Sequence, residues 1–219
     1  MKTRMLLIVI ALLIAATESS SEGVASETEE SVRVTIQEFY SGTDPIWIYG
    51  VSGRNSHPCK IDTNITKSGT NTFFRRYSHD GSGWRWNSIT AQLSGESDTF
   101  TVSYDDGERH SEKMLAASTN GDCALFEVAV RNTGAINTPL QKTRLRNFRP
   151  TSEIDFRVKR TDGHQQSFRK ICFSSVVNKA RKERKLPDSV QIEDFANIRC
   201  SQLCQGDAHC PEMLREAFN

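Results

Sequence analysis

The chain lacks an excess of charge of either sign. Its 219 residues include 28 Lys plus Arg against 27 Asp plus Glu, a formal net charge of +1 at pH 7. Proteins whose main partner is a nucleic acid usually carry a strongly basic domain, so this balance argues against such a partner. With 25% charged and 37% hydrophobic residues, the composition is that of one ordinary globular domain, not of a disordered tail or a coiled coil.

Catalytic signatures are also missing. The sequence contains no Gly-x-Ser-x-Gly elbow, no His-Glu-x-x-His pair, no Walker loop and no Gly-x-Gly-x-x-Gly fingerprint. The five histidines fall mostly in predicted turns, which argues against a converged catalytic triad. We therefore predict a protein that is not an enzyme and that uses neither a cofactor nor a metal.

Long apolar runs are missing except at the N-terminus. There, Lys2 and Arg4 precede about 12 uncharged, mostly apolar residues that end at Ala16, followed by small and polar residues. This is the pattern of a secretory signal, and it is well short of the roughly 20 residues that a membrane span requires. We predict a signal peptide over residues 1–16, with cleavage as late as about residue 21, and a soluble, extracellular product.

The rest of the chain divides into a short leader and one domain. Residues 17–30 are acidic and rich in serine, and they are predicted to form a flexible leader because they cannot bury enough apolar surface to order. Residues 31–219 are predicted to form the folded domain. No strong assembly motif is present, so a monomer is expected.

Residues from about 31 to 160 show the alternation of antiparallel β-structure. Short apolar and polar alternations are separated by Gly, Asn, Asp and Ser clusters, and consecutive hairpins indicate an up-and-down meander. An eight-stranded closed barrel removes the exposed sheet edges, whereas a two-sheet sandwich is the competing architecture. The barrel is favoured because an amphipathic helix predicted over 167–185 can cover one side of it. The predicted strands are 31–40, 58–66, 72–78, 84–93, 99–104, 111–117, 123–130 and 153–161.

Several short motifs extend over most of the mature chain. Asp44-Pro45-Ile46-Trp47 follows the first predicted strand, and Asp106-Gly107 marks a central hairpin. They are followed by the strand Cys123-Ala124-Leu125-Phe126-Glu127, by Cys172 in the late helix and by Cys200 near the C-terminus. In kind and in order, these motifs resemble the tick salivary lipocalins, the histamine-binding-protein family.

The resemblance implies an eight-stranded antiparallel up-and-down lipocalin barrel that is secreted in saliva. Such a protein sequesters host inflammatory mediators, either a biogenic amine such as histamine or serotonin, or a leukotriene or fatty acid. Some relatives instead inhibit a host defence protein such as a complement component, and this is the alternative function.

The six cysteines could pair in 15 ways, and the residues alone do not choose between them. The resemblance implies the disulfides Cys59–Cys200 and Cys123–Cys172, with Cys204 and Cys210 left as a local pair. A zinc cluster built from Cys200, Cys204, His209 and Cys210 is the competing hypothesis for the tail. Secretion favours disulfides over zinc.

The candidate ligand residues follow partly from chemistry and partly from the resemblance. An amine is a cation at neutral pH and needs carboxylates and aromatic faces. The resemblance places Asp44 and Trp47 at positions that contact amines, although Asp44 could equally be a turn residue that bonds its own backbone. The amine signature is incomplete, because Ala124 stands where the family has an aspartate. The predicted ligand-binding residues are Tyr40, Asp44, Trp47, Trp86, Phe100, Tyr104, Glu127, Asp155 and Arg157.

The last predicted strand leaves two interpretations open. Asp155 and Arg157 share one of its faces, and Ile154 and Phe156 share the other. If the charged face points inward, Arg157 could bind the carboxylate of an anionic lipid. If it points outward, it is a solvated surface, and the residues alone favour this second interpretation.

Two further features concern the surface. The basic run 179–185 could bind heparan sulfate, a membrane surface or an acidic host protein, but most such runs are solvated faces. A host protein could also contact the loop 133–150. Asn64-Ile65-Thr66 is the only Asn-x-Ser/Thr sequon, so Asn64 is a predicted glycosylation site.

Overall fold

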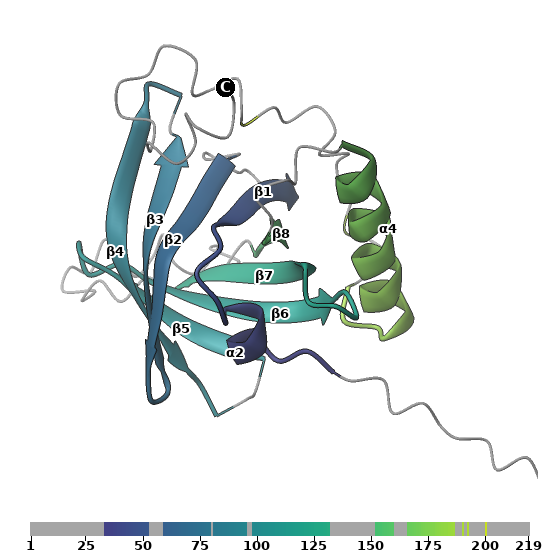
Figure 1. The fold of residues 1–219 in the computed structure, drawn as a ribbon, viewed down its shortest axis with the longest axis horizontal. Coiled ribbons are helices and arrows are strands. Elements are labelled where there is room, and N and C mark those ends of the chain that lie inside the picture. The colour runs from purple at the N-terminus through teal and green to yellow at the C-terminus, as the bar shows by residue number, and fades with distance from the viewer. Residues whose placement is uncertain are drawn as a thin grey trace, which may run out of the picture. The chain divides into compact units, whose positions relative to one another are not determined.

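The computed structural model describes residues 33–52, 59–79, 81–95, 98–131, 152–159 and 166–186, together with Val190, Ile192 and Cys200 (Figure 1). The predicted signal peptide and leader lie outside these residues, as do Cys204, Cys210 and the loop 133–150.

The described strands close into an antiparallel barrel. Each strand pairs with the next along the chain, and the last strand pairs with the first. The predicted fold class, an eight-stranded up-and-down barrel with a C-terminal helix, is therefore confirmed. The strands are β1 (Ile46–Ser52), β2 (Cys59–Ser68), β3 (Asn71–His79), β4 (Trp84–Leu93), β5 (Thr99–Tyr104), β6 (Arg109–Ala117), β7 (Cys123–Arg131) and β8 (Glu153–Val158).

The first predicted strand, 31–40, is wrong. Its second half forms the short helix α2 (Ile36–Phe39), which is fixed by a capping box. The Thr35 side chain accepts a hydrogen bond from the Glu38 backbone N–H at 3.2 Å, and the Glu38 carboxylate accepts one from the Thr35 backbone N–H at 2.7 Å. These bonds satisfy backbone donors that a helix otherwise leaves unpaired at its start.

The first strand of the barrel is instead β1, which follows the turn after α2. Its run Ile46-Trp47-Ile48-Tyr49 combines β-branched and aromatic residues, which suit a pleated surface buried on both faces. A strand buried on both faces shows no alternation of apolar and polar residues, and this is why the pattern at this position did not predict it.

The barrel has two apolar faces, one inside and one outside. Directly paired residues on neighbouring strands share a face. Ile46 and Ile48 on β1 belong to the interior cluster, into which α2 packs Ile36 and Phe39. The alternate positions of β1 belong to a second cluster on the outer surface, together with residues of the late helix.

The late helix is α4 (Gln166–Lys182), as predicted within a few residues. Its buried residues include Cys172, Val176 and Ala180, which pack on the outer cluster. Ile171, next to Cys172 on the same helix, is 72% exposed. The helix ends at Lys182, before Pro187, and Arg184 has a φ of +55°.

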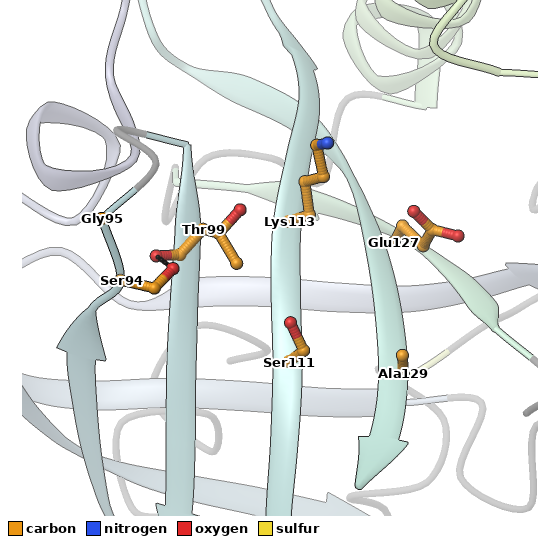
Figure 2. Close-up of a pocket in the computed structure, with 7 residues that line it drawn as sticks. All are labelled: Ser94, Gly95, Thr99, Ser111, Lys113, Glu127 and Ala129. Atoms are coloured by element: carbon orange, nitrogen blue, oxygen red, sulfur yellow. Dashed lines mark hydrogen bonds between the residues drawn. The ribbon is translucent and has the colours of Figure 1, made fainter.

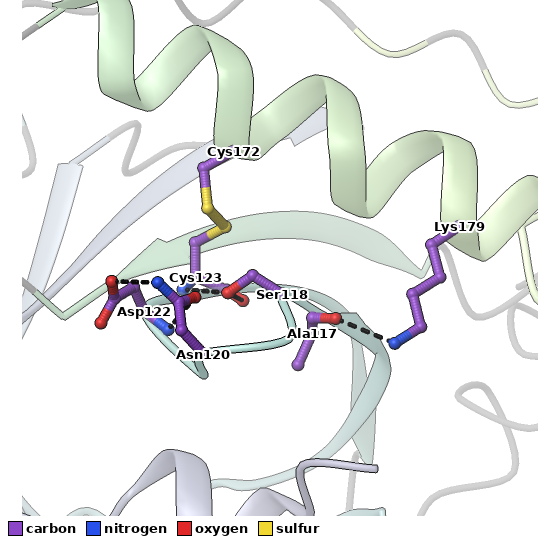
Figure 3. The surroundings of a disulfide bond; sticks show 7 residues. All are labelled: Ala117, Ser118, Asn120, Asp122, Cys123, Cys172 and Lys179. Atoms are coloured by element: carbon purple, nitrogen blue, oxygen red, sulfur yellow. Dashed lines mark hydrogen bonds between the residues drawn. A yellow bond between two sulfur atoms is a disulfide. The ribbon is translucent and has the colours of Figure 1, made fainter. Parts of the chain in front are cut away.

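Both disulfides implied by the resemblance are present and tie the outer face of the barrel to later parts of the chain. Cys59 on β2 is bonded to Cys200, and Cys123 on β7 is bonded to Cys172 on α4 (Figure 3). Lys179 anchors the other end of α4 by donating to the Ala117 carbonyl at 3.2 Å. Because Cys200 is in a disulfide, it has no thiolate to offer a zinc ion, and the zinc hypothesis is wrong for this residue.

In the part of the chain that the structure describes, no helix combines the length and apolar character needed to cross a lipid bilayer.

Candidate functional site: the charged interior of the barrel

Charged side chains occupy the middle of the barrel. They come from four strands and are buried, with no more than 3% of any residue exposed: Asp62 on β2, Arg76 on β3, Glu112 on β6, and Asp155 and Arg157 on β8. Each lies at an interior position, because its cross-strand partners or alternate neighbours belong to the interior cluster. The outward interpretation of the charged face of β8, which the sequence favoured, is therefore wrong.

Four of these residues form a continuous ion-pair network. Arg76 binds Asp62 in a bidentate manner, with Nε 2.7 Å from Oδ1 and Nη2 2.8 Å from Oδ2. Glu112 lies between the two arginines, with Oε1 2.5 Å from Arg76 Nη1 and Oε2 2.7 Å from Arg157 Nη1. Two carboxylates and two guanidiniums balance, so this network is neutral as a unit.

Two tyrosines complete the network. The Tyr40 hydroxyl donates to Asp62 Oδ2 at 2.9 Å and accepts from Arg157 Nη1, so it links the end of α2 to the charged layer. The Tyr104 hydroxyl accepts from Arg76 Nη1 at 3.0 Å. Burial raises the pKa of Tyr40 well above its ordinary value and the pKa of Tyr104 to about 12, so both stay neutral hydroxyls at physiological pH.

Glu112 is ionised despite its complete burial. Burial alone would raise its pKa, but the adjacent Arg157 and Arg76 guanidiniums outweigh burial and hold the pKa well below its ordinary value. An ionised carboxylate with two guanidinium partners is the arrangement that low-dielectric surroundings require.

Asp155 and Arg157 have incomplete partners, because Asp155 Oδ1 and Arg157 Nε are both buried without a hydrogen-bond partner among the described residues. The Oδ2 atom of Asp155 lies 3.4 Å from Arg157 Nη2 and 3.6 Å from Lys60 Nζ. Its other oxygen, Oδ1, is buried and has no hydrogen-bond partner in the part of the chain that the structure describes. Since buried polar atoms are nearly always hydrogen-bonded, this oxygen is a place where a ligand donor would be accepted.

One of the two cross-strand neighbours of Asp155 has no side chain. Its cross-strand partners are Phe126 on β7 and Gly50 on β1, and Gly50 has no side chain to cover it. Glycine inside a strand often marks close approach by a ligand or a bulge, and the β1 register also shifts just after Gly50. Arg157 pairs with Ile48, nearer the α2 end, so Asp155 lies toward the opposite end of the barrel.

The structure brings five of the nine predicted ligand residues together inside the barrel. Tyr40 and Phe100 are fully buried, with ring centroids 5.6 Å apart, and Tyr104, Asp155 and Arg157 lie in or beside the charged network.

The other four predicted ligand residues do not face the interior. Asp44 is exposed in the turn between α2 and β1, as the turn interpretation held. Trp47 is buried on the outer face, because it pairs with Ile61 and Val158 of the outer cluster. Trp86 is 51% exposed outside the barrel, and Glu127 points outward on β7.

Glu127 lines an open hollow on the outer surface of β5, β6 and β7 (Figure 2). The hollow has a volume of about 430 Å³ and is separated from the charged network by the wall of the barrel. It is lined by Ser94, Gly95, Thr99, Ser111, Lys113, Glu127 and Ala129.

Three network residues, Asp62, Arg76 and Glu112, were missed by the sequence analysis. A charge at an interior position of an alternating strand is the signal that could have found them. In β3, however, Arg75 and Arg76 are adjacent, and only the pairing of Phe74 with the interior Ile89 shows which arginine is inside. Arg75 points outward, where its guanidinium lies 4.9 Å from the centroid of the Trp86 ring.

Comparison with known proteins adds little beyond the architecture, which is that of the lipocalin class of barrels. No family model matches the chain, and no curated protein matches it. One similar solved structure is that of the siderocalin Ex-FABP, described as functioning through dual ligand specificities. It aligns with a TM-score of 0.43 and 10% sequence identity over 69% of this chain and 87% of that chain. The fold class rests on the strand pairing and not on this alignment.

Proposed function

We propose that this protein is a secreted binding protein that sequesters a small host mediator inside its barrel, and that the ligand is an amine. The observation that carries the proposal is the buried Asp155 carboxylate, whose Oδ1 has no hydrogen-bond partner among the described residues. Its position on an inward face, beside Gly50 and away from α2, supports a ligand that enters the barrel and donates to this oxygen.

The charges of the interior favour an amine over a fatty acid or leukotriene. Arg157 already donates to Glu112 and Tyr40, so its positive charge is matched. Arg157 Nε is also buried without a partner among the described residues, but a ligand carboxylate bound there would lie beside the Glu112 and Asp155 carboxylates, two anions. An ammonium group instead adds a cation next to a carboxylate whose partners lie at 3.4 and 3.6 Å, a favourable charge-assisted contact.

The setting of the proposed function follows from the chemistry of the chain and from the resemblance. The two disulfides suit an oxidising, extracellular compartment. The resemblance to tick salivary lipocalins supports saliva as the source and a host inflammatory mediator, such as histamine or serotonin, as the ligand.

Native mass spectrometry on the secreted, disulfide-intact protein tests this proposal. The protein is measured as purified and after incubation with histamine, serotonin, a cysteinyl leukotriene and arachidonic acid. We expect the protein to retain an amine at low micromolar concentration and to retain neither acid. Retention of an acid alone would overturn the amine assignment, and retention of none of the four would contradict the proposed function and favour a host-protein partner.

A further inference from the structure

Two large apolar side chains are exposed to solvent on the outer surface of β3 and β4. Among the described residues, Phe73 and Trp86 are two of the three large hydrophobic side chains that are exposed, at 38% and 51%. The Trp86 ring is partly covered by the Arg75 guanidinium. Among the described residues, no cation or second aromatic ring covers the Phe73 ring, so its exposure calls for another explanation.

The Asn64 sequon lies on the neighbouring strand β2, level with Phe73 on β3. Thr63 pairs with Arg75 and Thr66 pairs with Phe73, so β2 carries one extra residue between them. Ile65 belongs to the interior cluster, whereas Asn64 is exposed and has a φ of +54°, a conformation that asparagine tolerates better than most residues. Asn64 therefore projects outside the barrel from a bulge, next to the outer face of β3.

We infer that Asn64 carries an N-linked glycan and that its first sugars cover the Phe73 ring. Thr66, the third residue of the sequon, is the direct cross-strand partner of Phe73. Side chains in such a pair are about 4.5–5.5 Å apart at Cβ, and diagonal neighbours are about 7–8 Å apart. A sugar linked to Asn64 is therefore within reach of the ring, and its C–H face removes apolar area of Phe73 from water.

Trp86 provides a matched internal control. It is exposed on the same outer surface, but it pairs with Tyr77, four residues along β3 from Phe73. At about 3.3 Å per residue, this is roughly 13 Å away along the strand. The first sugars on Asn64 should cover Phe73 and leave Trp86 unchanged.

Hydroxyl-radical footprinting tests the inference directly. The protein is secreted from a eukaryotic host, the occupancy of Asn64 is measured by peptide mapping, and labelling is compared before and after native removal of the glycan with an amidase. We expect Phe73 labelling to rise several-fold on removal and Trp86 labelling to stay constant. An unoccupied Asn64, or equal labelling of Phe73 in both forms, would overturn the inference.

Thermal melting of matched variants distinguishes a specific contact between the glycan and Phe73 from a general effect of glycosylation on stability. Removal of the glycan should lower the Tm of the unsubstituted protein and of Trp86→Ala by about 2–4 °C, the shift that a contact of ordinary strength gives in a domain of this size. The loss should largely vanish in Phe73→Ala, because the ring that the sugar covers is gone. The same loss in all three proteins would contradict the inference.

Discussion

Substitution of Glu112 by glutamine should lower the free energy of unfolding by about 3–5 kcal/mol, the usual cost of breaking a buried ion pair by removing one partner. Glu112 is the only carboxylate in the described part of the network that bridges both arginines, at 2.5 Å from Arg76 and 2.7 Å from Arg157. The neutral amide keeps the shape of the side chain but leaves two buried guanidiniums with one fewer anion. Urea-induced unfolding measures the change.

Glu127→Gln is the matched control for this substitution. Glu127 lies on the adjacent strand β7 but points outward into the hollow on the surface, so its replacement should change the unfolding free energy by no more than about 0.5 kcal/mol. Equal effects of the two substitutions would show that Glu112 does not stabilise the fold through the buried network.

The same network gives the protein a defined response to acid. The pKa of folded Glu112 lies well below its ordinary value near 4.5, because two guanidiniums outweigh the effect of burial. The stability that this shift contributes is fully present above pH 4.5, and it is lost as the pH falls from there toward the folded pKa. The unfolding free energy of the unsubstituted protein should therefore fall more steeply below pH 4.5 than that of Glu112→Gln.

Asp155→Asn should weaken binding of a retained amine by about thirtyfold to a few thousandfold, as measured by isothermal titration calorimetry. Loss of one partner of a buried, hydrogen-bonded charge pair typically costs about 2–5 kcal/mol of binding free energy. The fold should be less affected than by Glu112→Gln, because the described partners of Asp155 lie at 3.4 and 3.6 Å and none of the described residues binds its Oδ1.

Asp44→Asn serves as the control for binding. The resemblance assigned Asp44 to the amine, but its side chain is exposed in the turn before β1, so its substitution should leave the affinity unchanged. A loss of affinity with Asp44→Asn and none with Asp155→Asn would show that the ligand binds beside the α2–β1 turn and not at β8.

Most of the barrel could be predicted from the sequence because seven of its strands are half-buried or bounded by clear turn residues. Gly107, for example, has a φ of +86° in the turn between β5 and β6, as its position in Asp106-Gly107 indicates. The exception is the N-terminal part. Alternation of Val34 and Ile36 imitates a strand there, while the capping box of Thr35 and Glu38 selects a helix.

The candidate site was harder to predict because the strand register decides which face of a strand points into the barrel. Alternation groups Asp155 with Arg157, but it does not say which side of the sheet is inside. That choice follows from the pairing of β8 with β1 and β7, which places both residues opposite interior positions. Trp47 was misplaced for the same reason: a shift of one residue along β1 changes the face on which a side chain lies.

The most direct test of the proposed function is a crystal structure of the protein with the amine that it retains. The structure should show the ligand inside the barrel, with its nitrogen about 2.7–2.9 Å from the Asp155 carboxylate, the distance of a charge-assisted hydrogen bond. A ligand that binds in the outer hollow beside Glu127, or inside the barrel without a polar contact to Asp155, would contradict the account.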